Sequence, residues 1–283
     1  VAIHPENEKI VYVSAGNQIH KTIDGGETWE PLLAAENQFG AVRLKIHPEN
    51  YNFLAAASSS GIFITTDGGA NWAKKWSNPT WDVEFKPGNP EVIYGLSKNI
   101  YGKFQVIVSK NEGISFQADS EFPDNYTETS GGLLAVTTDN PDVLLATLLA
   151  QENGDGIPFI LKGTAEEAKM NWTEIKRGEY NSVGGLGGFT NGQGYFDLVF
   201  EIAPDDENIV FWGTCTLFKS TDGGMSFSKT GGYGGEFPVH PDIQDMQILT
   251  GGETWVATDG GMNYSTDHFT SLENYSSRTK GII

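Results

Sequence analysis

The most informative segment of the chain is Thr22-Ile23-Asp24-Gly25-Gly26-Glu27-Thr28-Trp29, because its pattern recurs along the sequence. Ser or Thr opens it, Asp or Asn follows two positions later, glycine two positions after that, and an aromatic residue closes it. Further copies end at Trp72, Phe116 and Phe227, and a looser copy spans 258–264. A repeated pattern of this kind predicts a repeated unit of structure.

The pattern predicts a hairpin turn. A short polar side chain accepts backbone N–H bonds within its own turn, glycine supplies positive φ, and the aromatic ring packs inward between sheets. Nothing in such a turn requires chemistry. We therefore interpret four residues as structural: Asp24, Asp67, Asn111 and Asp222.

The repeat extends upstream of the turn. A hydrophobic strand, a Pro/Asn-rich turn such as His47-Pro48-Glu49-Asn50 and a second strand precede it, and the unit recurs about every 43 residues. A fourth unit keeps only Trp172 of its turn, in the stretch 165–172, and 166–170 is the one segment expected to form a helical turn. The approximate units are 1–40, 41–80, 81–130, 131–190, 191–235 and 236–283.

Six such units predict an all-β chain, a single β-propeller of four-stranded antiparallel blades over residues 1–283. The chain begins inside a repeat and ends where another blade would begin. We therefore expect a piece of a longer protein whose ring has seven or more blades, with a closed six-bladed ring as the alternative.

Composition limits the function. The net charge of −19 predicts no nucleic-acid partner and suits a secreted or cell-surface protein, and no apolar run is long enough to span a membrane. The one cysteine, Cys215, falls in a predicted strand over 210–218, where it is interpreted as a small hydrophobic residue. The pattern predicts no cofactor and no metal site.

Functional residues are expected at the end of each blade opposite the repeated turns. Propeller ligands bind at that face or at the central channel, and the loops there lead into the innermost strands. Acidic, aromatic and histidine side chains fall near these strand starts, and their convergence would bind a cation, accept hydrogen bonds from sugar hydroxyls or form an acid–base pair. The candidate ligand-binding residues are Trp81, Asp82, Tyr195, Asp197, His240, Asp242 and Asp259. Each acid could instead cap a loop.

The sixth unit has two alignments. If Val239-His240-Pro241 is the Pro turn, Asp259 belongs to a repeated turn and is structural. If 243–249 is the innermost strand, Asp259 moves to the opposite face beside His240 and Asp242, and Ser265-Thr266-Asp267 is a degenerate turn. The second alignment is favoured, because the first assigns a strand to the glycine-rich stretch 230–236.

The repeated pattern resembles the Asp-box, or bacterial neuraminidase, repeat. Over 190–283, Gly192 to Leu198, Ser220 to Gly224, His240-Pro241-Asp242 and Thr258 to Gly261 are similar to secreted Bacteroidetes propeller proteins, many of which end in a type IX secretion sorting domain. Those proteins often carry a second histidine where Gln244 stands, so the resemblance does not predict a paired-histidine metal site here.

Three functions follow from resemblance. Sialidases share the turn, but they need three substrate-binding arginines, commonly announced by an Arg-Ile-Pro motif, and a Tyr/Glu pair. The chain has just three arginines, Arg43, Arg177 and Arg278, and no such motif. Xyloglucan-cleaving hydrolases use one aspartate from each of two Asp-box propellers. Sortilin-type receptors and the propeller assembly factor of photosystem II bind proteins or peptides without catalysis.

We therefore expect a recognition scaffold that binds a glycan or protein, with further domains of the same polypeptide as additional partners. The alternative is a glycoside hydrolase, whose catalytic candidates are Asp197, Asp242 and Asp259.

Overall fold

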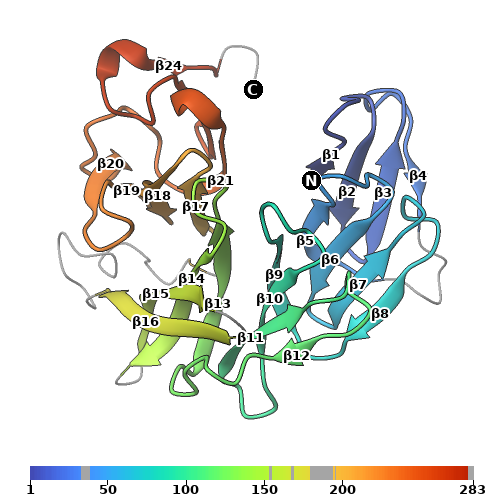
Figure 1. Ribbon diagram of the computed structural model, residues 1–283. Coiled ribbons are helices and arrows are strands. Elements are labelled where there is room, and N and C mark those ends of the chain that lie inside the picture. The colour runs from blue at the N-terminus through green and yellow to red at the C-terminus, as the bar shows by residue number, and fades with distance from the viewer. Residues whose placement is uncertain (33–38, 153–154, 167–168, 179–193, 195, 280–283) are drawn as a thin grey trace. The chain divides into compact units, whose positions relative to one another are not determined.

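The computed structural model describes residues 1–32, 39–152, 155–166, 169–178, 194 and 196–279 (Figure 1). The chain forms two compact units, Val1–Asp124 and Asn125–Ile283. Each contains three four-stranded antiparallel sheets, here called blades one to six in chain order. No helix within these residues is long and apolar enough to cross a membrane.

The first unit holds blades one to three. Within each blade, strands follow chain order from one edge to the other. Blade one comprises β1 (Ala2–Ile3), β2 (Val11–Ala15), β3 (Gln18–Thr22) and β4 (Glu30–Pro31); blade two comprises β5 (Ala41–Ile46), β6 (Leu54–Ser58), β7 (Gly61–Thr65) and β8 (Ala73–Trp76); blade three comprises β9 (Thr80–Phe85), β10 (Ile93–Lys98), β11 (Phe104–Ser109) and β12 (Gln117–Ala118).

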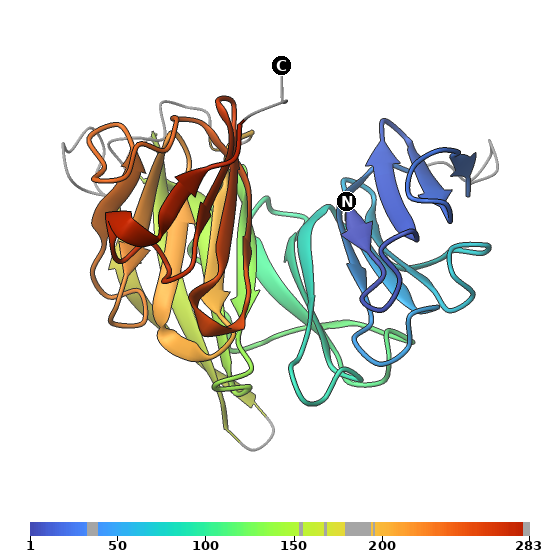
Figure 2. The same ribbon diagram turned by 90° about the horizontal axis from the view of Figure 1, so that it is seen from above.

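The second unit holds blades four to six, and blades five and six lie side by side (Figure 2). Blade four comprises β13 (Glu128–Val136), β14 (Val143–Glu152), β15 (Asp155–Glu166) and β16 (Lys169–Arg177); blade five comprises β17 (Val199–Ala203), β18 (Asp206–Gly213), β19 (Thr216–Ser220) and β20 (Ser228–Gly232); blade six comprises β21 (Ile243–Ile248), β22 (Thr254–Thr258), β23 (Gly261–Ser265) and β24 (Tyr275–Ser277). Two single-turn 3-10 helices, Thr250–Gly252 and Leu272–Asn274, complete the described elements.

The core consists of layers between neighbouring blades. Strand β6 is buried on both faces: Leu54 and Ala56 pack in a cluster with blade-one residues, while Ala55 and Ala57 pack with blade-three residues. In β18, Trp212 contributes to the layer shared with blade four and Phe211 to the layer shared with blade six. Successive strand residues point to opposite faces, so a middle strand buried on both faces must be apolar throughout.

The repeated turns have a common hydrogen-bond pattern. Asp24 accepts from the Thr28 backbone at 3.0 Å and from the Thr22 hydroxyl at 2.6 Å, and the Thr22 oxygen accepts from the Gly26 amide at 3.0 Å. Asp67, Asn111 and Asp222 make the corresponding bonds. Each carboxylate or amide thus closes its own turn.

Each repeated turn is also bonded to the turn between the first two strands of its blade. Gly25 donates to the Lys9 carbonyl at 3.0 Å and Gly68 to Asn52 at 2.8 Å, and in blade five Gly223 donates to Asn208, near the start of β18, at 3.0 Å. Both turns therefore lie at one end of the blade. We call the other end, where the second strand turns into the third, the loop face.

Blade six follows the second alignment of the sequence. Strand β21 is its first strand, and Asp267 closes the turn after β23 by accepting from Ser265, Thr270 and Ser271. His268 donates its backbone amide to Gly252, which repeats the bond between the two turns of the other blades. The alignment that placed Asp259 in this turn is wrong.

Two local expectations are also wrong. The stretch 166–170 was expected to be helical, but Glu166 ends β15 and pairs with Lys169 at the start of β16. Trp172 lies within β16, opposite Gly163. Pairing of two long strands supplies the backbone bonds that a helical turn would have made. The predicted strand over 210–218 is in fact two strands, and the turn between them contains Thr214 and Cys215.

Candidate functional site

Four segments meet at the loop face of blades five and six. Asp197 precedes β17, Cys215 lies between β18 and β19, Asp242 precedes β21, and Asp259 lies between β22 and β23. Because antiparallel neighbours reverse direction at each turn, these four positions all fall at the end opposite the repeated turns. The structure therefore brings together three of the sequence-predicted acids.

Gln244 bridges two of these acids. Its side-chain nitrogen donates to Asp197 Oδ1 and to Asp259 Oδ1, each at 2.8 Å. The two carboxylate oxygens therefore cannot be further apart than twice that distance. One amide group has two N–H donors, so a single glutamine can hold both acids.

A β-bulge directs Gln244 to this position. The pairing of β21 with β22 shifts between Ile243 and Asp245, so Gln244 is the extra residue of the strand. Trp81 occupies the same position in β9, between Thr80 and Asp82. Bulges re-aim side chains, and they are common beside functional sites.

Asp242 ties the segments together through its backbone. Its amide donates to the Cys215 carbonyl at 3.4 Å, its carbonyl accepts from the Asp259 amide at 3.3 Å, and the next amide, of Ile243, donates to Thr214 at 2.8 Å. Asp242 has a φ of 67°, in the left-handed region that asparagine and aspartate tolerate better than most residues. The turn from β18 to β19 is thus fixed against the start of β21.

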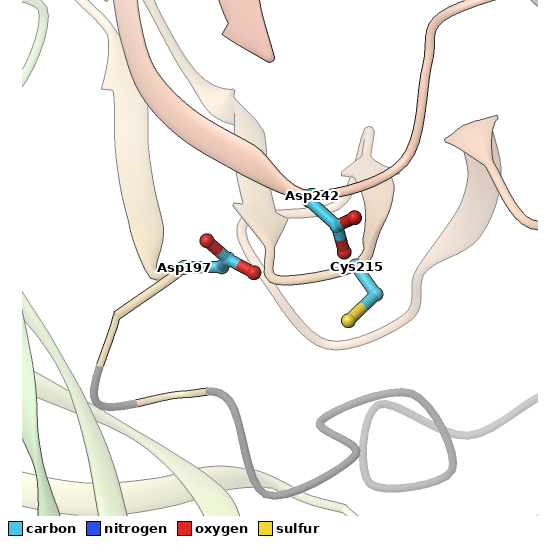
Figure 3. Close-up of side chains that lie close together, drawn as sticks. All are labelled: Asp197, Cys215 and Asp242. Carbon is cyan, nitrogen blue, oxygen red and sulfur yellow. The ribbon is translucent and has the colours of Figure 1, made fainter. Parts of the chain in front are cut away.

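Asp197, Cys215 and Asp242 form a close cluster (Figure 3). One ligand atom from each lies within 4.8 Å of the other two. Asp197 and Cys215 have no exposed surface, whereas Asp242 is half-buried. Asp197 Oδ1 is bonded to Gln244, but its buried Oδ2 has no hydrogen-bond partner among the described residues.

The electrostatics of Asp197 follow from this environment. Burial raises the pKa of its carboxyl group, and the negative charges of Asp242 and Asp259 raise this pKa further, while the hydrogen bond from Gln244 opposes them. Perturbed carboxyl groups of this kind gather at functional sites.

His240 borders the cluster. It is exposed, and its Nδ1 lies 2.9 Å from the Pro241 carbonyl oxygen. A Cβ at Gly260, next to Asp259, would come within 2.5 Å of His240 Cβ. Only glycine allows this close approach of the two loops.

The remaining sequence candidates lie elsewhere. Trp81 and Asp82 belong to the first unit, where Trp81 packs against Phe104 and beneath Lys98. Asp82 is buried, with Oδ1 3.9 Å from Arg43 Nε and accepting from the Val83 amide. Tyr195 lies outside the described residues.

Sequence reasoning missed Cys215 and Gln244 as site residues. Cys215 was placed inside a strand, although Gly213-Thr214 offers a turn at the point where each blade needs one. Gln244 was considered only as the position of an absent histidine. Its role depends on the bulge in β21, which the sequence pattern does not reveal.

A Tyr–Glu pair is present, but its chemistry is unlike that of a nucleophile. Tyr126 donates to Glu174 Oε2 at 2.5 Å, and Arg177 holds the same carboxylate at 3.0 Å. Burial and the neighbouring Glu174 raise the pKa of the Tyr126 hydroxyl, so it keeps its proton. We therefore interpret the Tyr126–Glu174 pair as a structural contact.

The fold defines an all-β protein of the propeller class, with six four-stranded blades. The chain is similar to a glycoside hydrolase family 74 enzyme of Niastella koreensis, with 17% identity, a TM-score of 0.64 and coverage of 96% of this chain and 45% of that one. It is also similar to the family 74 xyloglucanase of Xanthomonas campestris, with 16% identity, a TM-score of 0.65 and coverage of 94% and 44%.

A third similar structure is PorZ, a surface component of the type IX secretion system of Porphyromonas gingivalis. It has 13% identity and a TM-score of 0.55 over 95% of this chain and 31% of that one. The chain thus spans less than half the length of each of these three proteins. No protein family and no curated protein matches the sequence. Likeness at these identities shows the fold alone.

Proposed function

We propose that the chain is an extracellular or cell-surface recognition scaffold that binds a glycan or protein at the loop face of blades five and six. The observation that carries the proposal is the convergence of three acids: Gln244 bridges Asp197 and Asp259, and Asp242 lies beside Asp197. These residues come from separate segments, and the repeated turns that stabilise each blade lie at its other end. The scaffold therefore leaves the loop face for recognition.

The cluster has the chemistry to bind polar ligands. Carboxylates accept hydrogen bonds from sugar hydroxyls, and they attract lysine and arginine side chains of a protein. Asp242 is half-buried and Asp259 exposed, so both present oxygen atoms to a ligand. The net charge of −19 favours a cationic protein segment over an anionic one.

Binding can be measured by calorimetry with xyloglucan oligosaccharides and, separately, with a lysine-rich peptide. The triple variant Asp197→Ala, Asp242→Ala, Asp259→Ala should fold and lose most of the affinity for whichever probe binds. The matched control is Asp245→Ala, which removes an exposed carboxylate of β21, next to Gln244. Unchanged affinity in the triple variant would remove this face from consideration.

A second candidate is glycoside hydrolysis. Asp197 has a raised pKa, as a general acid requires, and Gln244 holds its Oδ1 close to Asp259 Oδ1. Retaining glycosidases have carboxyl groups about 5 to 5.5 Å apart, whereas inverting enzymes need more space for a water molecule. The upper limit set by the two Gln244 bonds is compatible with the retaining arrangement of these two carboxyl groups.

This candidate is tested by incubating the protein with xyloglucan and measuring reducing ends. Hydrolysis that disappears in Asp197→Asn and in Asp259→Asn, with binding retained, would establish an enzyme. Hydrolysis by both variants at the wild-type rate would exclude Asp197 and Asp259 as the catalytic acids. Binding without hydrolysis would leave the recognition scaffold as the function.

The cellular location is part of the same proposal. The acidic composition, together with the likeness to the surface component PorZ, supports export by a type IX system in a Bacteroidetes source. Fractionation of the source organism with an antibody to this chain would test it: surface or medium is expected, and a purely cytoplasmic signal would contradict the proposal.

A further inference from the structure

Cys215 is placed in an acidic environment by its turn. It is the one cysteine of the chain, and it lies fully buried with a ligand atom within 4.8 Å of those of Asp197 and Asp242. Inside a strand, as the sequence suggested, it would have been one more apolar side chain of the core. In the turn between β18 and β19 it lies beside two carboxylates instead (Figure 3).

Asp197 supplies the independent indication of a ligand. Its side chain has no exposed surface, and Gln244 satisfies only Oδ1. Oδ2 is buried without a hydrogen-bond partner among the described residues. A buried carboxylate oxygen in that state loses its solvation without compensation, and a coordinated cation supplies such compensation.

We propose that Asp197, Cys215 and Asp242 bind a divalent metal ion of the zinc type. The donor set distinguishes among metals: calcium and magnesium bind oxygen ligands, whereas a cysteine sulfur with carboxylate oxygens suits zinc and similar ions. The thiol proton passes to solvent as the sulfur binds the metal. The sequence pattern predicted no metal site, and Cys215 was expected inside a strand.

Three protein ligands would leave one position of a tetrahedral ion open to a further ligand. Asp242 is the half-buried member of the set, so solvent reaches the cluster on its side. A ligand hydroxyl or carboxylate oxygen would bind there. The inference deepens the proposed function, because the ion would lie within the site proposed for glycan or protein binding.

The test uses Co²⁺ as a spectroscopic substitute for zinc. The protein is stripped with a chelator and titrated with Co²⁺ while its absorbance is recorded. We expect one Co²⁺ ion to bind per chain and a thiolate-to-cobalt charge-transfer band to develop in the near ultraviolet. Excess Zn²⁺ should displace the cobalt and abolish this band. The charge-transfer band reports a sulfur ligand, so binding at surface carboxylates or histidines does not produce it.

Variants assign the ligands. Cys215→Ser should abolish the charge-transfer band, and Asp197→Asn or Asp242→Asn should weaken Co²⁺ binding at least tenfold. The control variant Asp245→Asn changes an exposed acid of β21 and should bind Co²⁺ as the wild type does. Circular dichroism confirms that each variant is folded, and the two aspartate variants keep the test valid if Cys215→Ser is unstable.

Two results would overturn the inference. The first is the absence of a charge-transfer band at saturating Co²⁺ in the wild-type protein. The second is a band that persists unchanged in both aspartate variants. No glycan or protein is present in the titration, so a protein that does not bind Co²⁺ would leave the proposed function intact. A protein that binds Co²⁺ but neither the glycan nor the peptide probe would reject the proposed function alone.

Discussion

The side-chain nitrogen of Gln244 lies 2.8 Å from Asp197 Oδ1, a carboxylate oxygen without exposed surface. The same nitrogen lies 2.8 Å from Asp259. Gln244 is thus the donor that holds two acids together.

Replacing Gln244 by Glu should destabilise the second unit by about 1 to 3 kcal/mol, because it removes the donor and adds a third negative charge beside two carboxylates. Gln244→Leu should cost less, since it removes the donor alone. Urea unfolding at neutral pH measures the free energy of unfolding of both variants. Gln247→Glu, an exposed change in the same strand, is the control. Equal effects of the Gln244→Glu and Gln247→Glu variants would contradict the bridging role.

Asp222→Ala should lower the free energy of unfolding by about 1 to 2 kcal/mol, because Asp222 accepts bonds from Ser220, from the Ser226 amide and from the Ser226 hydroxyl. Asp222→Asn should cost clearly less. Blade three already uses Asn111 in this position, where its oxygen accepts and its nitrogen donates to Ser115.

The reciprocal change, Asn111→Asp, serves as the matched control and should be nearly neutral, because Ser115 can reverse its hydroxyl and donate. Chemical denaturation of the three variants gives the comparison. An Asp222→Asn variant as unstable as Asp222→Ala would show that the charge, rather than the hydrogen bonds, stabilises the turn.

The stability of the first unit should fall as pH drops below about 6.5, through His47. Burial lowers the pKa of this histidine against the opposing charges of Glu49 and Glu112, and its Nδ1 accepts from the Glu49 and Asn50 amides. The folded state therefore binds fewer protons than the unfolded state. Its stability is complete above the ordinary histidine pKa and is lost as pH falls toward the lowered one.

The experiment is urea unfolding between pH 8 and 5 for the wild type and for His47→Thr. The matching turn of blade four uses Thr137, whose hydroxyl oxygen accepts from the Asp139 amide, so threonine retains an acceptor without a titrating ring. The variant should show a smaller loss of stability over this range. An identical loss would assign the pH dependence to other groups.

Thr147→Val should destabilise the second unit by about 1 to 3 kcal/mol, although the two side chains have nearly the same shape. The Thr147 hydroxyl accepts from Trp212 Nε1 at 3.0 Å between blades four and five, and both residues are fully buried. The variant leaves an indole N–H buried without an acceptor. In a Trp212→Phe background, Thr147→Val should lower the free energy of unfolding much less, because the indole N–H is absent. Additive effects of the two substitutions in this double-mutant cycle would contradict coupling between Thr147 and Trp212.

The propeller class was predictable because its signals are local. Each repeated turn is closed by bonds within eight residues, and each strand shows its own apolar pattern, so Asp24 and Asp222 were correctly placed in turns. The alignment of blade six was also predictable, since 243–249 is the better strand former. The turn at Cys215 was missed, because apolar residues stand on both sides of the short turn signal Gly213-Thr214.

The repeated pattern was sufficient to predict the six blades and the turns closed by Asp24, Asp67, Asn111 and Asp222, and it favoured the alignment that puts Asp259 at the loop face. Tertiary structure alone decided that Asp197, Asp242 and Asp259 meet. Their contact depends on how blade five packs against blade six and on the bulge that turns Gln244 toward both carboxylates. Hydrogen bonds within a turn are encoded by neighbouring residues, whereas contacts between blades depend on the summed packing of distant strands.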